Sequence, residues 1–149
     1  MPSIVRYQKA SDAWTEYTLR GPDDPDAPQI TELATVDGKT YVSVPDGVEL
    51  PEQYAQIADS VEAVALTPEL RKAIIEASPQ AQLINQRMIE KIRATYSPDD
   101  EAYLNRITVG MMAGLYTMQP GEMEEVQAFG AFVEGVRQWG REQRAAFGL

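Results

Sequence analysis

The sequence predicts an α+β protein, in which an N-terminal β-hairpin module over residues 1–50 precedes a C-terminal bundle of about four α-helices over residues 51–149. Two observations carry this prediction. Asp37-Gly38 separates two alternating apolar runs, and an Asp-Gly pair in that setting is the strongest short-range signal for a β-hairpin. Thr67-Pro68, Ser78-Pro79 and Ser97-Pro98 repeat one N-cap chemistry, which indicates three helix starts in the second half.

Two hairpins are expected in the front module. Ile4–Tyr7 and Ala13–Leu19 are rich in β-branched and aromatic residues, and the three residues Ala10–Asp12 between them are typical of a turn. Ile30–Val36 and Tyr41–Val44 flank the Asp-Gly turn and form the second predicted hairpin. The acidic front therefore begins with strands.

Two segments outside these hairpins are interpreted from their composition. Gly21–Pro28 combines three prolines with Asp23, Asp24 and Asp26, which predicts an exposed loop. A metal site built from the three aspartates is the alternative, but the segment lacks the glycine and the distal glutamate of a calcium loop. Glu52–Leu66 has an apolar pattern that fits a helix and, towards its end, a strand, so its type stays open.

The helical half is punctuated by caps and breaks. The first predicted helix runs from Pro68 to about Ala77, and the second ends before Tyr96. The third begins near Asp99, carries apolar residues as far as Leu115, and stops at the Gln119-Pro120-Gly121 break. The last begins near Glu122 with acids in its first turn and ends among arginines, so its charges complement the helix dipole at both ends.

Composition excludes several classes of function. With no Cys and no His in 149 residues, the chain has no thiolate nucleophile, no histidine base, and neither a cysteine zinc site nor a histidine-based metal site. No glycine-rich phosphate loop follows a strand, and no nucleophile elbow occurs. The sequence therefore predicts a protein that is not an enzyme and needs no cofactor or metal.

The charge argues in the same direction. The formal net charge of −10 disfavours binding to nucleic acid or to an anionic membrane, and no apolar run is long enough to cross a bilayer. The acidity lies in the front, with 4 basic against 12 acidic side chains up to Leu66 and 9 against 11 afterwards. Mimicry of nucleic acid, which would inhibit a host nucleic-acid-binding enzyme, is therefore an alternative function.

The last predicted helix carries the candidate interface. Its broad apolar face either packs against the earlier helices or binds another subunit or partner. Its three glycines each cost about 1 kcal/mol relative to Ala in a helix interior, and close approach of a neighbouring helix or chain would repay that cost. The candidate interface residues are Phe129, Phe132, Val136, Trp139, Gly130, Gly135 and Gly140.

Two further groups have two interpretations each. Met111, Met112, Met118 and Met123 cluster around the last turn, and methionine suits either an irregular core or a contact surface. Asp99-Asp100-Glu101 could serve acid–base chemistry or bind a divalent ion, but a first helical turn explains three acids as capping groups and as a complement to the dipole.

The helical half contains the junction Ile92-Arg93-x-x-Tyr96-Ser97-x-x-Asp100-Glu101, followed by a final helix with the sequence of Phe132–Glu142. From Leu66 to the C-terminus, this pattern resembles small phage and prophage proteins that accompany tail-fibre and baseplate genes. One stretch departs from the pattern, because 107–116 is apolar here and contains Gly110 and Gly114, whereas those proteins carry more charge there.

The resemblance implies a tail component or a tail-fibre- or baseplate-associated assembly protein that acts through protein–protein contacts. It implies several copies, with a homo-oligomer and phage fibre or baseplate proteins as partners. The expected location is the cytoplasm during assembly, and the virion tail if the protein stays in the particle. The front module would then vary to fit a given partner.

Overall fold

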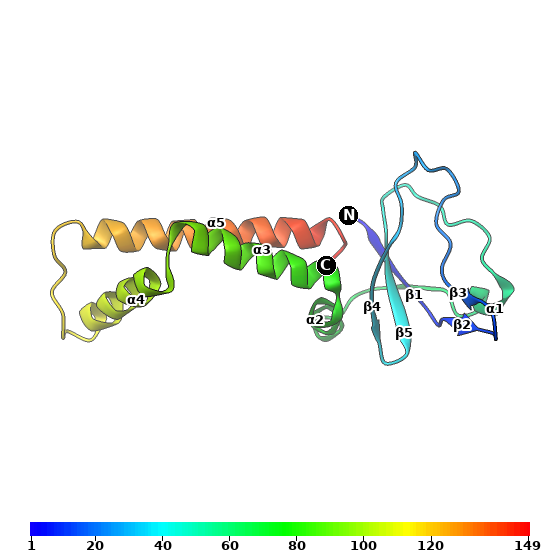
Figure 1. The fold of residues 1–149 in the computed structure, drawn as a ribbon, viewed down its shortest axis with the longest axis horizontal. Helices are drawn as coiled ribbons and strands as arrows, with labels where there is room; N and C mark the ends of the chain where they lie inside the picture. Colours follow the sequence, from blue (N-terminus) through cyan, green and yellow to red (C-terminus); the bar gives the residue numbers. More distant parts are fainter. The chain divides into compact units, whose positions relative to one another are not determined.

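The computed structural model describes residues 1–149 and confirms the α+β class, with an antiparallel sheet followed by helices (Figure 1). The chain forms two compact units. The first, here the sheet unit, comprises residues 1–83 and 143–149; the second, the helical unit, comprises residues 84–142. The boundary expected after residue 50 falls inside the sheet unit, because the next elements of the chain pair with or pack against the strands.

The main sheet has four antiparallel strands in the order β4-β5-β1-β6. The second predicted hairpin is confirmed as β4 and β5. Asp37 and Gly38 both have positive φ, 51° and 77°, as a two-residue type I′ turn requires. A bulge between Glu32 and Ala34 shifts the register of that hairpin. The strands are β1 (Ser3–Tyr7), β4 (Thr31–Val36), β5 (Lys39–Val44) and β6 (Glu62–Val64).

The first predicted hairpin is wrong in its pairing. β1 does not pair with 13–19, because β5 and β6 occupy its two edges. A separate two-stranded ribbon forms instead from β2 (Ala10–Ser11) and β3 (Glu16–Tyr17). Asp12 closes its turn by accepting hydrogen bonds from the backbone N–H groups of Trp14 and Thr15 and from the Tyr17 hydroxyl. Trp14 sits on that turn with 95% of its surface exposed.

Glu52–Leu66 contains both of the expected element types. A single helical turn, α1 (Ala55–Ala58), buries Ile57 and precedes the edge strand β6. The proline-rich loop 21–28, which lies before β4, has neither helix nor strand, as expected. Both segments belong to the sheet unit.

The sheet unit has apolar clusters on both faces of the sheet, because alternate strand residues point to opposite sides. Ile4 and Tyr41 pack on one side with Ile74 and the C-terminal Leu149. Val5, Tyr7 and Val42 pack on the other side with Leu19 and Ile57. The helix α2 (Pro68–Ala77) packs against β4 on the first side.

Four longer helices confirm the predicted starts. Thr67 caps α2 by accepting a hydrogen bond from the Leu70 N–H at 3.2 Å, and Ser97 and Asp100 form a capping box on α4. In the helical unit, α5 runs beside the end of α3 and beside α4 (Figure 1). None of the helices is long and apolar enough to cross a membrane. The helices are α2 (Pro68–Ala77), α3 (Pro79–Thr95), α4 (Pro98–Met112) and α5 (Glu122–Ala145).

The third helix is shorter than the sequence predicts. It ends at Met112, and Leu115 lies outside it. Gly114 adopts a left-handed φ of 72°, which ends a helix at little cost only when the residue is glycine. The N–H of Gly114 bonds to the Met111 carbonyl, and the N–H of Leu115 bonds to the Gly110 carbonyl at 2.8 Å, so both of these carbonyls near the end of α4 are satisfied.

Candidate interaction surface on the helical unit

Three of the predicted interface residues on α5 are engaged within the chain. Val136 is buried, and the Phe129 ring packs edge-on against Tyr96 with the ring centroids 4.9 Å apart. A Cβ added at Gly140 would lie 3.0 Å from Cε of Met88 on α3. The close neighbour expected at a helix glycine is therefore a methionine side chain at this position, and it comes from the same chain.

Three others line an open cavity of about 460 Å³ between α3 and α5, here called the α3–α5 cavity. Its lining is almost entirely apolar, and its one cation is Lys91, whose Nζ lies 4.7 Å from the ring centroid of Trp139. Phe132 also packs against Tyr96, 5.5 Å between centroids. The lining residues are Lys91, Ala94, Phe132, Gly135, Val136 and Trp139.

The glycines of α5 differ in their surroundings. A Cβ at Gly130 or at Gly135 would meet nothing within 4 Å, so both positions are open. Gly135 lines the α3–α5 cavity, whereas Gly130 does not. The packing of this chain alone thus explains Gly140 but neither of the other two.

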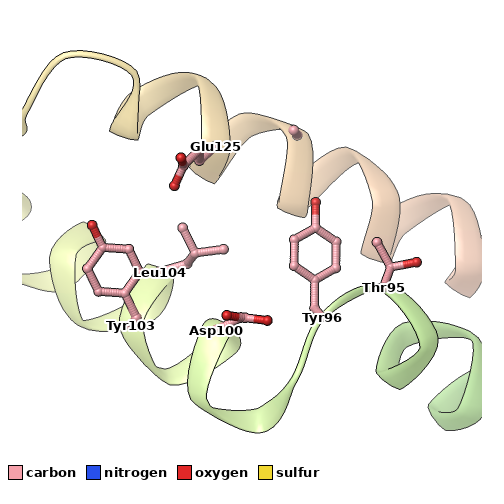
Figure 2. Close-up of a pocket in the computed structure, with 7 residues that line it drawn as sticks. Thr95, Tyr96, Asp100, Tyr103, Leu104 and Glu125 are labelled. Carbon is pink, nitrogen blue, oxygen red and sulfur yellow. The ribbon is translucent and has the colours of Figure 1, made fainter.

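A second cavity of about 320 Å³ lies between the start of α4 and the first half of α5 (Figure 2). Figure 2 shows Glu125 projecting from α5 towards Leu104, with Tyr96 and Tyr103 at the two sides. This α4–α5 cavity is more polar than the α3–α5 cavity, because its lining includes two carboxylates and three side chains with hydroxyl groups. Its lining contains no cation. The lining residues are Thr95, Tyr96, Asp100, Tyr103, Leu104, Glu125 and Ala128.

Glu122, the first residue of α5, ties the α4–α5 connection together. It is only 6% exposed, and its carboxylate accepts hydrogen bonds from the Tyr103 hydroxyl, from the Tyr116 hydroxyl at 2.6 Å and from the Gln119 N–H at 2.7 Å. These donors lower the pKa of Glu122, because they favour the charged form. The bond to Glu122 in turn raises the pKa of Tyr103 to about 12.

Sequence reasoning missed this cluster. Glu122 was explained as a complement to the dipole of the last helix, which is correct for its place in the first turn. The two tyrosines are separated from it by 19 and 6 residues, and no periodicity connects a helix start to hydroxyls on a preceding helix and loop. The only available signal was an acid directly after a Pro-Gly turn.

Apolar side chains are displayed where α4 ends. Val109, Met112 and Leu115, here called the α4 tip, are 65%, 78% and 87% exposed. The methionine cluster divides between the two interpretations: Met111 and Met118 are half-buried, whereas Met112 and Met123 are exposed. Val109 and Met112 are three residues apart on α4 and Leu115 follows the helix end, and exposed apolar side chains that occur together mark contact sites more often than isolated ones do.

Many acidic side chains are engaged in hydrogen bonds or ion pairs within the chain. Asp100 accepts a hydrogen bond from the Ser97 N–H at 2.9 Å, so the capping interpretation of that residue is confirmed. In the acidic front, Arg6, Lys9 and Arg20 pair with Glu62, Glu32 and Asp23, with N–O distances of 2.6, 2.8 and 3.0 Å. No group of three or more acidic side chains in the chain is arranged to hold a metal ion.

No protein-family model, no curated protein and no solved structure matches the chain. The α4 tip and the two cavities are therefore the observations that bear on function.

Proposed function

We propose that the protein is a non-enzymatic phage tail component, a tail-fibre- or baseplate-associated assembly protein that acts through protein–protein contacts. The resemblance of residues 66–149 to such proteins supports the phage assignment. The observation that carries the contact role is the α4 tip, where three large apolar side chains are mostly exposed at one end of the helical unit.

The setting of the α4 tip favours binding. Burial of exposed apolar side chains in a partner would release about 25 cal/mol for each Å² removed from water. The Glu122 hydrogen bonds to Tyr103 and Tyr116 connect α4, the following loop and α5, so the chain around the tip is ordered before a partner arrives. Order of this kind lowers the entropy lost on binding.

Capture of tail proteins tests the proposal. The tagged chain is co-expressed with the tail-fibre and baseplate proteins encoded near its gene, and the bound proteins are identified by mass spectrometry. We expect the wild-type chain to retain at least one of them, and the Met112→Ser/Leu115→Ser variant to lose most of that binding.

Trp14→Ser is the matched control, because Trp14 is also highly exposed but lies on the turn of the sheet unit. It should retain the captured protein. Failure of the wild-type chain to capture any tail protein would contradict the assembly role, and equal capture by the tip variant and the control would contradict the role of the tip.

A further inference from the structure

One flank of α5 alternates small and large side chains. Ala128, Phe132, Gly135 and Trp139 are spaced by four, three and four residues, which places them along a single stripe of the helix. All four line the two cavities: Ala128 the α4–α5 cavity, and the other three the α3–α5 cavity. We call this stripe the α5 flank.

The order of sizes along the α5 flank is self-complementary. When two copies of a helix pack antiparallel about a two-fold axis, residues at equal distances on either side of one midpoint face each other. Phe132 and Gly135 lie at equal distances from the peptide between Val133 and Glu134, and so do Ala128 and Trp139. Each large side chain of one copy therefore faces a small residue of the other, as ridge-into-groove packing requires.

We propose that a second copy of this chain covers the α5 flank, antiparallel and about a two-fold axis near that peptide. Phe132 of each copy lies over Gly135 of the other, and Trp139 lies over Ala128. The open space at Gly135 admits the facing phenyl ring. This contact repays a helix-interior glycine that nothing within the chain explains.

The charges at the two ends of the flank support the second copy as occupant. Lys91 lies beside Trp139 at one end, and Glu125 lies about one turn before Ala128 at the other end. The antiparallel arrangement brings Lys91 of each copy to Glu125 of the other, which gives two opposite-charge pairs in each dimer. A parallel arrangement would place like ends together.

The same arrangement also contains one unfavourable contact, which the two-fold axis repeats twice in each dimer. It brings Glu124 of one copy near Glu142 of the other, at a rim where both residues are exposed. Solvent screens such pairs, so they weaken an interface without preventing it. This pair adds a test of the register, because Glu142→Lys should tighten the dimer.

The dimer deepens the proposed assembly role and depends on it for its biological meaning, but its test needs only the isolated full-length chain. Sedimentation equilibrium over a series of concentrations should show a monomer–dimer equilibrium. Gly135→Leu should leave a monomer, because the leucine fills the space that Phe132 of the second copy requires. Gly130→Leu is the matched control, since Gly130 is an equally open interior glycine away from the flank, and it should still dimerise.

Charge reversal gives a second measurement that does not depend on glycine. Lys91→Glu and Glu125→Lys should each weaken dimerisation about tenfold, because each reverses two pairs in the dimer. The two changes combined in one chain should restore the affinity to within about threefold, which a different partner protein on this flank would not explain. Far-UV circular dichroism checks that every variant keeps its helices.

Several outcomes would overturn the inference: a monomer at all concentrations, equal loss of the dimer in Gly130→Leu and Gly135→Leu, or no restoration by the double reversal. A monomer that still captures a tail protein would overturn the dimer and leave the proposed function intact. A dimer that captures no tail protein would do the opposite.

Discussion

Replacement of Gly140 by Ala tests how the helical unit is packed, and Gly130→Ala is its internal reference. Both glycines lie inside α5, where Ala is more favourable than Gly by about 1 kcal/mol. At Gly130 the added methyl group meets nothing within 4 Å. Gly130→Ala should therefore raise the free energy of unfolding by about 1 kcal/mol.

At Gly140 the same gain is opposed by a clash. The new Cβ would lie 3.0 Å from Cε and 3.2 Å from Cγ of Met88, and closer still to its sulfur, so the methionine must leave its present rotamer. Overpacking of this kind typically costs about 1–3 kcal/mol. The atoms that clash are mainly the flexible end of a half-buried methionine, so the cost should lie at the low end of this range, about 1 kcal/mol. That cost offsets the gain of about 1 kcal/mol, and Gly140→Ala should leave the free energy of unfolding nearly unchanged.

Truncation of the methionine removes the clash. In a Met88→Ala background, Gly140→Ala should stabilise the chain by about 1 kcal/mol, as Gly130→Ala does in the wild type. The coupling between positions 88 and 140 is then about 1 kcal/mol in a double-mutant cycle. This cycle cancels any other contact that Met88 makes, provided that both backgrounds keep the helical unit folded.

Trp139 provides the probe for the cycle. The chain has two tryptophans, and a Trp14→Phe background leaves Trp139, next to Gly140, as the only one. Urea unfolding is followed by its fluorescence and extrapolated linearly to water. One fixed protein concentration is used, because association shifts apparent stability. A coupling below about 0.5 kcal/mol would refute the assigned packing of Met88 on Gly140.

Two further predictions concern the Glu122 cluster and the sheet unit. The pKa of Glu122 is lowered in the folded chain, chiefly by the Tyr103 and Tyr116 hydroxyls. The stability that the charged Glu122 contributes should therefore be complete above the ordinary pKa of 4.5 and be lost as the pH falls through the lower folded pKa. Glu122→Gln should reduce this loss of stability at acid pH when unfolding is measured against pH, and an unchanged acid dependence would contradict the cluster. Ile74 is fully buried between α2 and the sheet, so Ile74→Ala should lower the free energy of unfolding by about 2–5 kcal/mol, and by clearly more than the half-buried neighbour Ile75→Ala in the same urea assay.

Helix starts and the tight hairpin could be predicted because their causes are local. The Ser97 hydroxyl and the Asp100 carboxylate satisfy backbone groups only three residues away, so the sequence alone contains both partners. Asp37-Gly38 likewise supplies the two positive φ angles of its own turn. Interactions that close within one turn are visible without a fold.

The first hairpin failed for the opposite reason. β1 and the segment around Trp14 have similar β propensity, but β1 gains more by lying between β5 and β6, where its residues are covered on both faces. Asp12 can close a local turn at the same time, which leaves Trp14 exposed. The choice of a strand partner depends on burial far along the chain, and local propensity carries no information about it.

The glycines of α5 show where sequence reasoning could have gone further. Gly130, Gly135 and Gly140 are five residues apart, and five residues turn a helix by about 140° beyond one full revolution. The three glycines therefore point in three directions, so one neighbouring helix cannot account for all of them. Met88 of α3 meets Gly140, and at most one of the others can face a second partner.

The neighbours decide which glycine that is. Gly135 lies between Phe132 and Trp139 at an apolar cavity, and Lys91 is beside it. Gly130 is open but lines no such cavity. A helix that bears a small residue between two half-buried aromatics has the shape to receive a copy of itself. For this reason, loss of the dimer in Gly135→Leu but not in Gly130→Leu would identify Gly135 as part of a packing interface. Equal effects of the two substitutions would mean that Gly135 is only a position where glycine lowers helix stability.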